Sequence, residues 1–260
     1  MAASRLVAPT FSEEQIDEFL ALTRASDSVE LKLTVPESEH FTTAQALGVD
    51  PLEAQIRQVF FFDTPQLELN KLGLVVRARR VQRKSGGDFI VKMRPVVPGE
   101  LPERLRRART FNVEVDALPG GFVCSGTLKR RAGNEEVRQV VSGDLPLQSL
   151  SSKFQRQLLA DHAAKGPRLD DLQVLGPILV LKLKFVPEGF GRELVGELWS
   201  YPDNSRVLEL STKCAPGEAF QVAAEARAFL SSAGIDLSGD QETKTLKALE
   251  FFAGRLAAGD

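Results

Sequence analysis

The sequence contains three short runs in close succession, Phe60-Phe61-Phe62-Asp63-Thr64-Pro65, Leu74-Val75-Val76-Arg77-Ala78-Arg79-Arg80 and Phe89-Ile90-Val91-Lys92-Met93-Arg94-Pro95. In each run every second residue is apolar, and turn residues separate the runs. Successive side chains of a β-strand point to opposite faces, so Arg77 shares a face with Arg79, and Lys92 shares one with Arg94. The pattern predicts strands that are apolar on one side and charged on the other.

The same alternation recurs elsewhere in the chain, at residues 28–35, 110–116, 178–185, 192–200 and 206–213. The most regular example is Ser28-Val29-Glu30-Leu31-Lys32-Leu33-Thr34-Val35, with strict period-two spacing. Pro202-Asp203-Asn204 is a turn signature that joins the last two of these segments in a hairpin. We therefore expect one sheet built from strands between about residues 28 and 213.

Helices are expected at both ends of this sheet. Ser12 followed by Gln15 forms a capping box before a helix at 12–24, and helices are predicted again at about 216–257. The stretch 117–176 is less regular, and we interpret it as a connector or insertion with a helix near 152–164. These elements predict a single α+β domain over residues 1–260.

Composition limits the function. The 260 residues include 33 basic and 35 acidic side chains, which argues against a protein that coats nucleic acid or binds a membrane through a basic patch. No apolar run approaches the roughly 20 residues that span a bilayer, and we identify no signal peptide. The two cysteines, Cys124 and Cys214, are far apart and form no metal-binding motif. We expect a soluble, cytoplasmic protein.

The charged faces of the predicted strands carry both signs. Their basic residues are Lys32, Arg77, Arg79, Lys92, Arg94, Lys182, Lys184 and Lys213, and their acidic residues are Glu30, Glu114, Asp116, Glu197 and Glu209. An interior with so much charge is too polar for dry packing, so a closed sheet would enclose a solvated tunnel. Arginine and lysine suit phosphate oxygens, and carboxylates suit Mg²⁺ or Mn²⁺. Glu114, Asp116 and Glu197 are also consistent with simple ion pairs to neighbouring cations.

These residues resemble the CYTH superfamily, the triphosphate tunnel metalloenzymes, which include thiamine triphosphatases, inorganic triphosphatases and class IV adenylate cyclases. The resemblance rests on Glu30-Leu31-Lys32, Phe61-Phe62-Asp63-Thr64-Pro65, Leu72-Gly73, Val76-Arg77-Ala78-Arg79-Arg80, Val91-Lys92 and the late Glu209. It covers about residues 28–213 and is most specific over 28–95. It implies an eight-stranded antiparallel β tunnel, closed or nearly closed, with flanking helices.

The resemblance also implies roles for the charged residues. Catalytic and phosphate-holding roles fall on Lys32, Arg77, Arg79 and Lys92, with Arg94, Lys182, Lys184 and Lys213 as further substrate-binding candidates. Metal-binding roles fall on Glu30 and Glu209, with Glu114 and Glu197 as additional candidates. The implied cofactor is Mg²⁺ or Mn²⁺, and the implied ligand is a triphosphate-bearing small molecule or inorganic polyphosphate.

The chain departs from the family pattern at three points. The first strand of the family reads E-x-E-x-K, whereas Ser28 stands here at the first acid. Ser211 follows Glu209 where paired glutamates are common, and the usual R-x-E-x-E becomes Thr110-Phe111-Asn112-Val113-Glu114. Fewer carboxylates should weaken the binding of a hard cation.

Three functions therefore remain open. The leading hypothesis is divalent-metal-dependent hydrolysis of an inorganic or organic triphosphate. The alternatives are a nucleotide cyclase and a non-catalytic module that binds triphosphate or another polyanion. The sequence contains no G-x-x-x-x-G-K-[ST] loop, G-x-S-x-G elbow or H-E-x-x-H helix, which excludes the commonest other phosphate-binding, hydrolase and protease sites.

Overall fold

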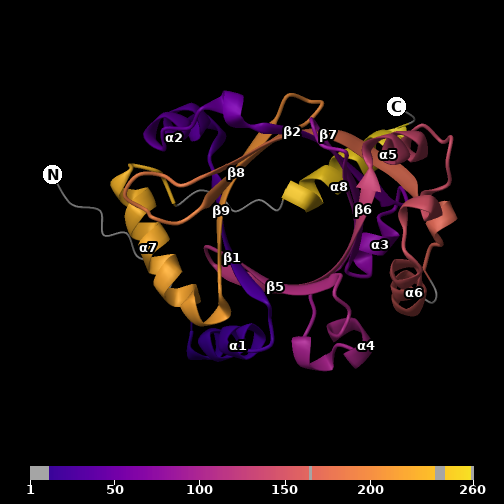
Figure 1. The fold of residues 1–260 in the computed structure, drawn as a ribbon, viewed down its shortest axis with the longest axis horizontal. Coiled ribbons are helices and arrows are strands. Elements are labelled where there is room, and N and C mark those ends of the chain that lie inside the picture. The colour runs from indigo at the N-terminus through magenta and orange to yellow at the C-terminus, as the bar shows by residue number, and fades with distance from the viewer. Residues whose placement is uncertain (1–11, 164–165, 238–243, 259–260) are drawn as a thin grey trace.

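The computed structural model describes residues 12–163, 166–237 and 244–258, and these residues build a closed β-barrel of nine strands (Figure 1). The strands are β1 (Ser28–Val35), β2 (Gln55–Asp63), β3 (Leu74–Val81), β4 (Gly86–Met93), β5 (Phe111–Leu118), β6 (Gly121–Gly133), β7 (Gln173–Phe185), β8 (Leu194–Ser200) and β9 (Arg206–Cys214). Around the barrel their order is β1-β5-β6-β4-β3-β2-β7-β8-β9, and β9 pairs with β1 to close the ring.

The closed barrel with flanking helices confirms the predicted fold class, with one strand more than the eight expected. An odd number of strands cannot alternate in direction all the way around a ring, so one neighbouring pair must be parallel. That pair is β1 and β5, in the register Ser28↔Glu114 and Glu30↔Asp116. All other neighbours are antiparallel.

The additional strand, β6, comes from the stretch 117–176 that the sequence pattern suggested was a connector. That interpretation was wrong for its first part, because β6 pairs with both β4 and β5. Small residues interrupt the alternation here, and Gly126 has a steric role. A Cβ at Gly126 would lie 2.6 Å from Cζ of Phe111 on the paired strand. The remainder of the stretch holds α5 (Asn134–Val141), α6 (Lys153–His162) and the first residues of β7.

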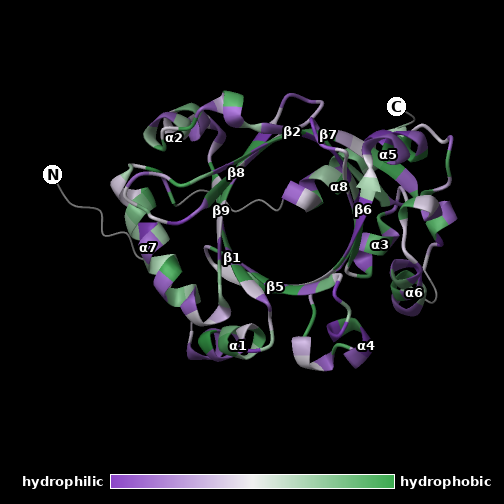
Figure 2. Cartoon of the chain, in the orientation of Figure 1, coloured by the Kyte–Doolittle hydropathy of each residue, from purple (hydrophilic) through white to green (hydrophobic). Residues whose placement is uncertain are grey.

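Helices surround the outer face of the barrel, and the hydropathy colouring shows polar and hydrophobic residues on each of them (Figure 2). Besides α5 and α6 they are α1 (Glu13–Thr23), α2 (His40–Ala46), α3 (Glu68–Lys71), α4 (Glu103–Arg106) and α7 (Ala219–Ser232). Outward-facing Phe60, Phe62 and Phe89 form one buried core with Val137 of α5 and Leu158 of α6. In the described ranges, no helix combines the length and apolar character needed to cross a bilayer.

The last helix, α8 (Lys244–Ala258), takes a different place and enters the ring of strands (Figure 1). Its Leu249 and Phe252 are buried against Val59, Phe61 and other apolar residues of the inner wall. Burying these side chains removes apolar surface from water and fixes the helix in place. Part of the barrel interior is therefore an apolar core filled by α8, and the rest remains charged.

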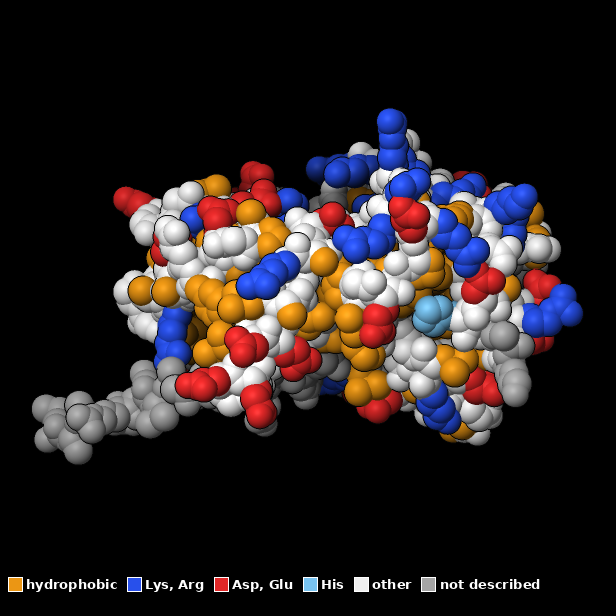
Figure 3. Space-filling view, turned by 90° about the horizontal axis from the view of Figure 1, so that it is seen from below, with side chains coloured by type: hydrophobic (Ala, Val, Ile, Leu, Met, Phe, Trp, Pro, Cys, Tyr) orange, Lys and Arg blue, Asp and Glu red, His pale blue; other side chains and the backbone are white. Residues whose placement is uncertain are grey.

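One face of the outer surface is mixed in character. Seen from below, it carries basic and acidic side chains among hydrophobic ones (Figure 3). Because basic and acidic residues are nearly equal in number, a binding site for an anion requires local clustering of basic side chains.

Candidate functional site

The charged part of the barrel interior encloses a cavity of about 620 Å³. Its basic lining residues are Lys32, Arg77, Arg79, Lys92, Arg94, Arg109, Lys129, Lys182, Lys213 and Lys244, and its acidic ones are Glu30, Glu114, Asp116, Glu197 and Glu209. Ten basic side chains thus face five acidic ones. This excess makes the cavity attractive to a multiply charged anion.

Most of the residues predicted from strand parity lie in this cavity. Lys184 is the exception among the predicted cations, since it does not line the cavity. It stands next to the end of β7, where its side chain is 57% exposed and pairs with Glu193 at 2.6 Å. Lys184 has the same parity as Lys182, so parity alone did not reveal that it lies beyond the cavity.

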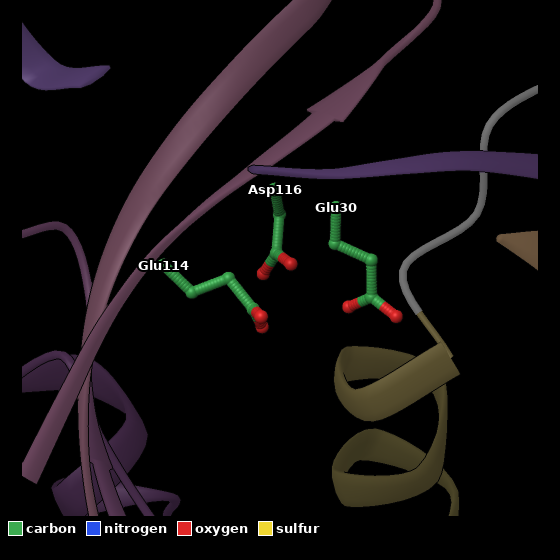
Figure 4. Close-up of side chains that lie close together, drawn as sticks. All are labelled: Glu30, Glu114 and Asp116. Carbon is green, nitrogen blue, oxygen red and sulfur yellow. The ribbon is translucent and has the colours of Figure 1, made fainter. Parts of the chain in front are cut away.

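Three carboxylates converge on one side of the cavity, and Figure 4 shows Glu30, Glu114 and Asp116 pointing toward one another. One oxygen of each lies within 4.8 Å of the others. The parallel pairing of β1 with β5 produces this arrangement, because it sets Glu30 directly beside Asp116. We refer to these residues as the three-carboxylate group.

Lysines contact the three-carboxylate group. Lys32 Nζ lies 2.8 Å from Asp116 and 3.1 Å from Glu30, and Lys92 Nζ lies 3.1 Å from Asp116. Lys213 pairs with Glu114. Burial alone would raise the pKa of Asp116, but the contacts with Lys32 and Lys92 hold that pKa below its ordinary value. Asp116 is therefore ionised at neutral pH.

The serines found in place of expected acids support these carboxylates. Ser28 Oγ donates a hydrogen bond to Glu114 Oε2 at 3.2 Å, and Ser211 Oγ donates one to Glu30 Oε1 at 3.0 Å. In the family pattern the other acid of this strand stands two residues before Glu114, where this chain has Asn112. Here the other acid is Asp116, two residues after Glu114. Strand parity placed Asp116 on the charged face, but the family resemblance did not mark it as a metal ligand.

Glu197 and Glu209 form a separate acidic pair, so the predicted metal set of Glu30, Glu114, Glu197 and Glu209 is divided between two places. Glu197 on β8 is the cross-strand neighbour of Glu209 on β9. Lys244 Nζ lies between the two carboxylates, 2.5 Å from Glu197 and 2.7 Å from Glu209.

Lys182 contacts the other oxygen of Glu197 at 2.7 Å. Burial would raise the pKa of Glu197, but Lys244 and Lys182 hold it well below its ordinary value. Sequence reasoning missed Lys244, because strand parity says nothing about a helix that enters a barrel.

The anion-binding side of the cavity centres on Arg77 and Arg79. Asp88 holds Arg79 through two hydrogen bonds of 2.7 and 2.5 Å and also contacts Lys129 at 3.2 Å. Nε of Arg77, by contrast, is buried without a hydrogen-bond partner. Burial and the nearby charge of Arg79 lower the pKa of Arg77 to about 10, so the guanidinium stays charged at neutral pH. Arg77 is thus oriented into the cavity with bonding capacity left for a ligand.

The three-carboxylate group fits a divalent cation. Mg²⁺ and Mn²⁺ prefer oxygen ligands, and several carboxylates that lie close together provide both the donors and the negative charge. The residues suited to hold the ion are therefore Glu30, Glu114 and Asp116.

A scan of protein-family models and a search of curated proteins found no match to this sequence. Solved structures do match. One is a candidate adenylyl cyclase from Hippeastrum described as having a dominant triphosphatase activity. It has a TM-score of 0.61 and 18% identity, with 84% of this chain and 94% of that one covered. Another is a candidate adenylate cyclase from Bacillus halodurans, with a TM-score of 0.59 and 13% identity, and 85% and 97% covered.

These similarities, together with the closed barrel and its charged interior, establish a CYTH-like fold for this chain, as its sequence motifs predicted. At identities below 20% the likeness concerns the fold. The function of the cavity depends on the residues that line it.

Proposed function

We propose that this protein binds a triphosphate in the charged cavity and hydrolyses it with the help of Mg²⁺ or Mn²⁺. The observation that carries the proposal is the meeting of two features in one cavity. These are the three-carboxylate group and the guanidinium of Arg77, whose Nε has no protein partner. The proposed ligand is a triphosphate-bearing small molecule or inorganic polyphosphate, with no role for nucleic acid or membrane.

Basic side chains would bind the phosphate chain and hold it in place. Lys32, Arg77, Arg79 and Lys92 line the cavity and would stabilise the negative charge that develops on the transferred phosphoryl group. Arg94, Lys182 and Lys213 also line the cavity and would bind the remaining phosphates. Catalysis of phosphoryl transfer depends mainly on such positioning and charge stabilisation.

Glu30, Glu114 and Asp116 would hold the divalent cation. When bound, the ion supplies positive charge to phosphate oxygens and favours attack by water. The chain's own residues prepare the site, because Ser28 and Ser211 orient two of the carboxylates. Phosphate binding would draw lysines such as Lys92 and Lys213 away from the carboxylates and toward the ligand.

The description of the Hippeastrum protein supports handling of a triphosphate, and the names of both structural neighbours raise cyclisation as a second activity. Hydrolysis is the better supported of the two. The cavity contains many basic side chains and a carboxylate group, whereas none of its described lining residues is aromatic except Phe111. A base-stacking surface of the kind that a nucleotide would use is therefore small.

The test is phosphate release from tripolyphosphate, ATP and thiamine triphosphate, each with Mg²⁺ and with Mn²⁺, and with cyclic nucleotide measured in the ATP reactions. We expect metal-dependent phosphate release from at least one substrate, and strong loss of turnover in Glu30→Gln and Asp116→Asn. Binding of tripolyphosphate without turnover under any condition would replace the proposal with a non-catalytic module. Cyclic nucleotide as the main product would replace it with a cyclase.

A further inference from the structure

Lys244 is held firmly inside the barrel at the start of α8. Its side chain is 14% exposed, and its Nζ lies 5.1 Å from the ring centroid of Trp199. Its backbone carbonyl accepts a hydrogen bond of 3.0 Å from the Tyr201 hydroxyl. One and two turns further on, Leu249 and Phe252 bury the helix against the inner wall. The packing of α8 therefore fixes the backbone of Lys244 and holds its ammonium close to the two carboxylates.

The ammonium lies where two carboxylates would otherwise repel each other. Glu197 and Glu209 are direct cross-strand neighbours, and each contributes one oxygen to Lys244. Two carboxylates at this spacing require a cation between them or a bound proton. Although burial lowers it, these two glutamates raise the pKa of Lys244 above its ordinary value, so the lysine supplies that cation.

The three-carboxylate group differs in two respects. It has three carboxylates instead of two, and one of its lysines, Lys213, has a side chain that is 55% exposed and free to turn toward solvent or ligand. A divalent ion can therefore displace Lys213 from Glu114. At the Glu197–Glu209 pair, by contrast, the cation is the ammonium of Lys244, which belongs to the packed helix α8.

We propose that Lys244 takes the place of a second divalent cation at the Glu197–Glu209 pair, so that the cavity accepts one metal ion, at Glu30, Glu114 and Asp116. Removing the charge of Lys244 creates a second site for Mg²⁺ or Mn²⁺ between Glu197 and Glu209. The prediction of one ion in the unmodified protein rests on the metal site of the proposed function. The prediction of a new site between Glu197 and Glu209 after substitution of Lys244 does not.

The experiment counts Mn²⁺ ions bound per chain by titration with detection of free Mn²⁺ by electron paramagnetic resonance, without substrate. The wild type is expected to bind one ion and Lys244→Met two. Methionine is nearly as long as lysine and keeps its helix preference without its charge. Lys247→Met is the matched control. It removes a charge from the same helix, over Tyr201 and outside the cavity lining, and is expected to bind one ion.

A second variant is independent of how Lys244→Met folds. Glu209→Gln keeps Lys244 and is expected to retain one Mn²⁺ with an affinity within about twofold of the wild type. Two ions in the wild type, an unchanged count in a folded Lys244→Met protein, or loss of the ion in Glu209→Gln would each overturn the inference. A wild type that binds no Mn²⁺, beside a Lys244→Met protein that binds one, would refute the metal site of the proposed function and support the inference.

Discussion

Ser28 donates a hydrogen bond from its Oγ to Oε2 of Glu114, across 3.2 Å and 86 positions of the chain. The bond crosses between β1 and β5, the parallel pair of the barrel. A serine here does not supply a metal ligand, but it orients a neighbouring one. With serine in place of an acid, this position orients the Glu114 carboxylate through a hydrogen bond and adds no carboxylate of its own.

Restoring an acid at this position should strengthen metal binding. In Ser28→Glu the added carboxylate starts on the same face as Glu30 and directly beside Glu114 in the register. Since hard cations favour anionic oxygen ligands, we expect about a tenfold or greater gain in Mn²⁺ affinity. Calorimetric titration checks this. Ser231→Glu, which adds the same charge on an exposed part of α7, should leave the affinity unchanged, and an equal gain in both variants would contradict the account.

The basic side chains should contribute unequally to anion binding. Arg77→Ala or Lys92→Ala should weaken tripolyphosphate binding by about 1.5 to 3 kcal/mol, the scale of a hydrogen bond to a charged group. Lys184→Ala is the matched control on the outside of the cavity, where the lysine pairs with Glu193, and it should change the affinity little. Isothermal calorimetry without metal measures all three. Losses of similar size in Lys184→Ala and Arg77→Ala would show that the anion binds elsewhere.

The free energy of unfolding should fall in acid as Asp88 becomes protonated. Burial would raise its pKa, but the hydrogen bonds and charge of Arg79, with the charge of Arg77, lower it to about 2. Because the pKa in the folded protein is below the unfolded value, the stabilisation is present above about pH 4 and disappears as the pH falls toward 2.

Asp88→Asn removes this dependence. The free energy of unfolding of the wild type should exceed that of Asp88→Asn at pH 6, and about 2 kcal/mol of the difference should be lost by pH 2. Denaturant titrations across this range measure it. Two curves that stay parallel from pH 6 to pH 2 would be incompatible with the ion pair seen here.

The packing of α8 inside the barrel should contribute strongly to stability. Leu249 is 2% exposed and packs against the inner wall, so Leu249→Ala should cost about 2 to 5 kcal/mol in the free energy of unfolding. Leu246 lies on the same helix at 37% exposure, and Leu246→Ala should cost about 1 kcal/mol or less. Urea denaturation compares the two. Equal losses would indicate that α8 does not pack inside the barrel in solution.

The resemblance to a known family predicted the closed barrel, and strand parity predicted most of the cavity lining, because the strands around the cavity are apolar outside and charged inside. Lys32, Arg77 and Lys92 reach the cavity for this reason. The same rule did not predict β6, where Ser125, Gly126 and Thr127 replace the alternating large side chains. At Gly126 a side chain would clash with Phe111 of the neighbouring strand, which a single sequence does not show.

The grouping of the acids also depended on information beyond parity. Parity places Glu30, Glu114, Glu197 and Glu209 on one surface, but the distances among them depend on which strands are neighbours. The parallel pairing of β1 with β5 adds Asp116 to the three-carboxylate group. Because α8 enters the barrel, Glu197 and Glu209 form ion pairs with Lys244.

The most direct test of the account is a crystal structure of the protein with Mn²⁺ and tripolyphosphate, with the ion located by its anomalous scattering. We expect one Mn²⁺ peak among Glu30, Glu114 and Asp116, and phosphate density in the cavity against Arg77 and Lys92. A metal peak elsewhere in the barrel, or tripolyphosphate bound only to its outer surface, would contradict the account.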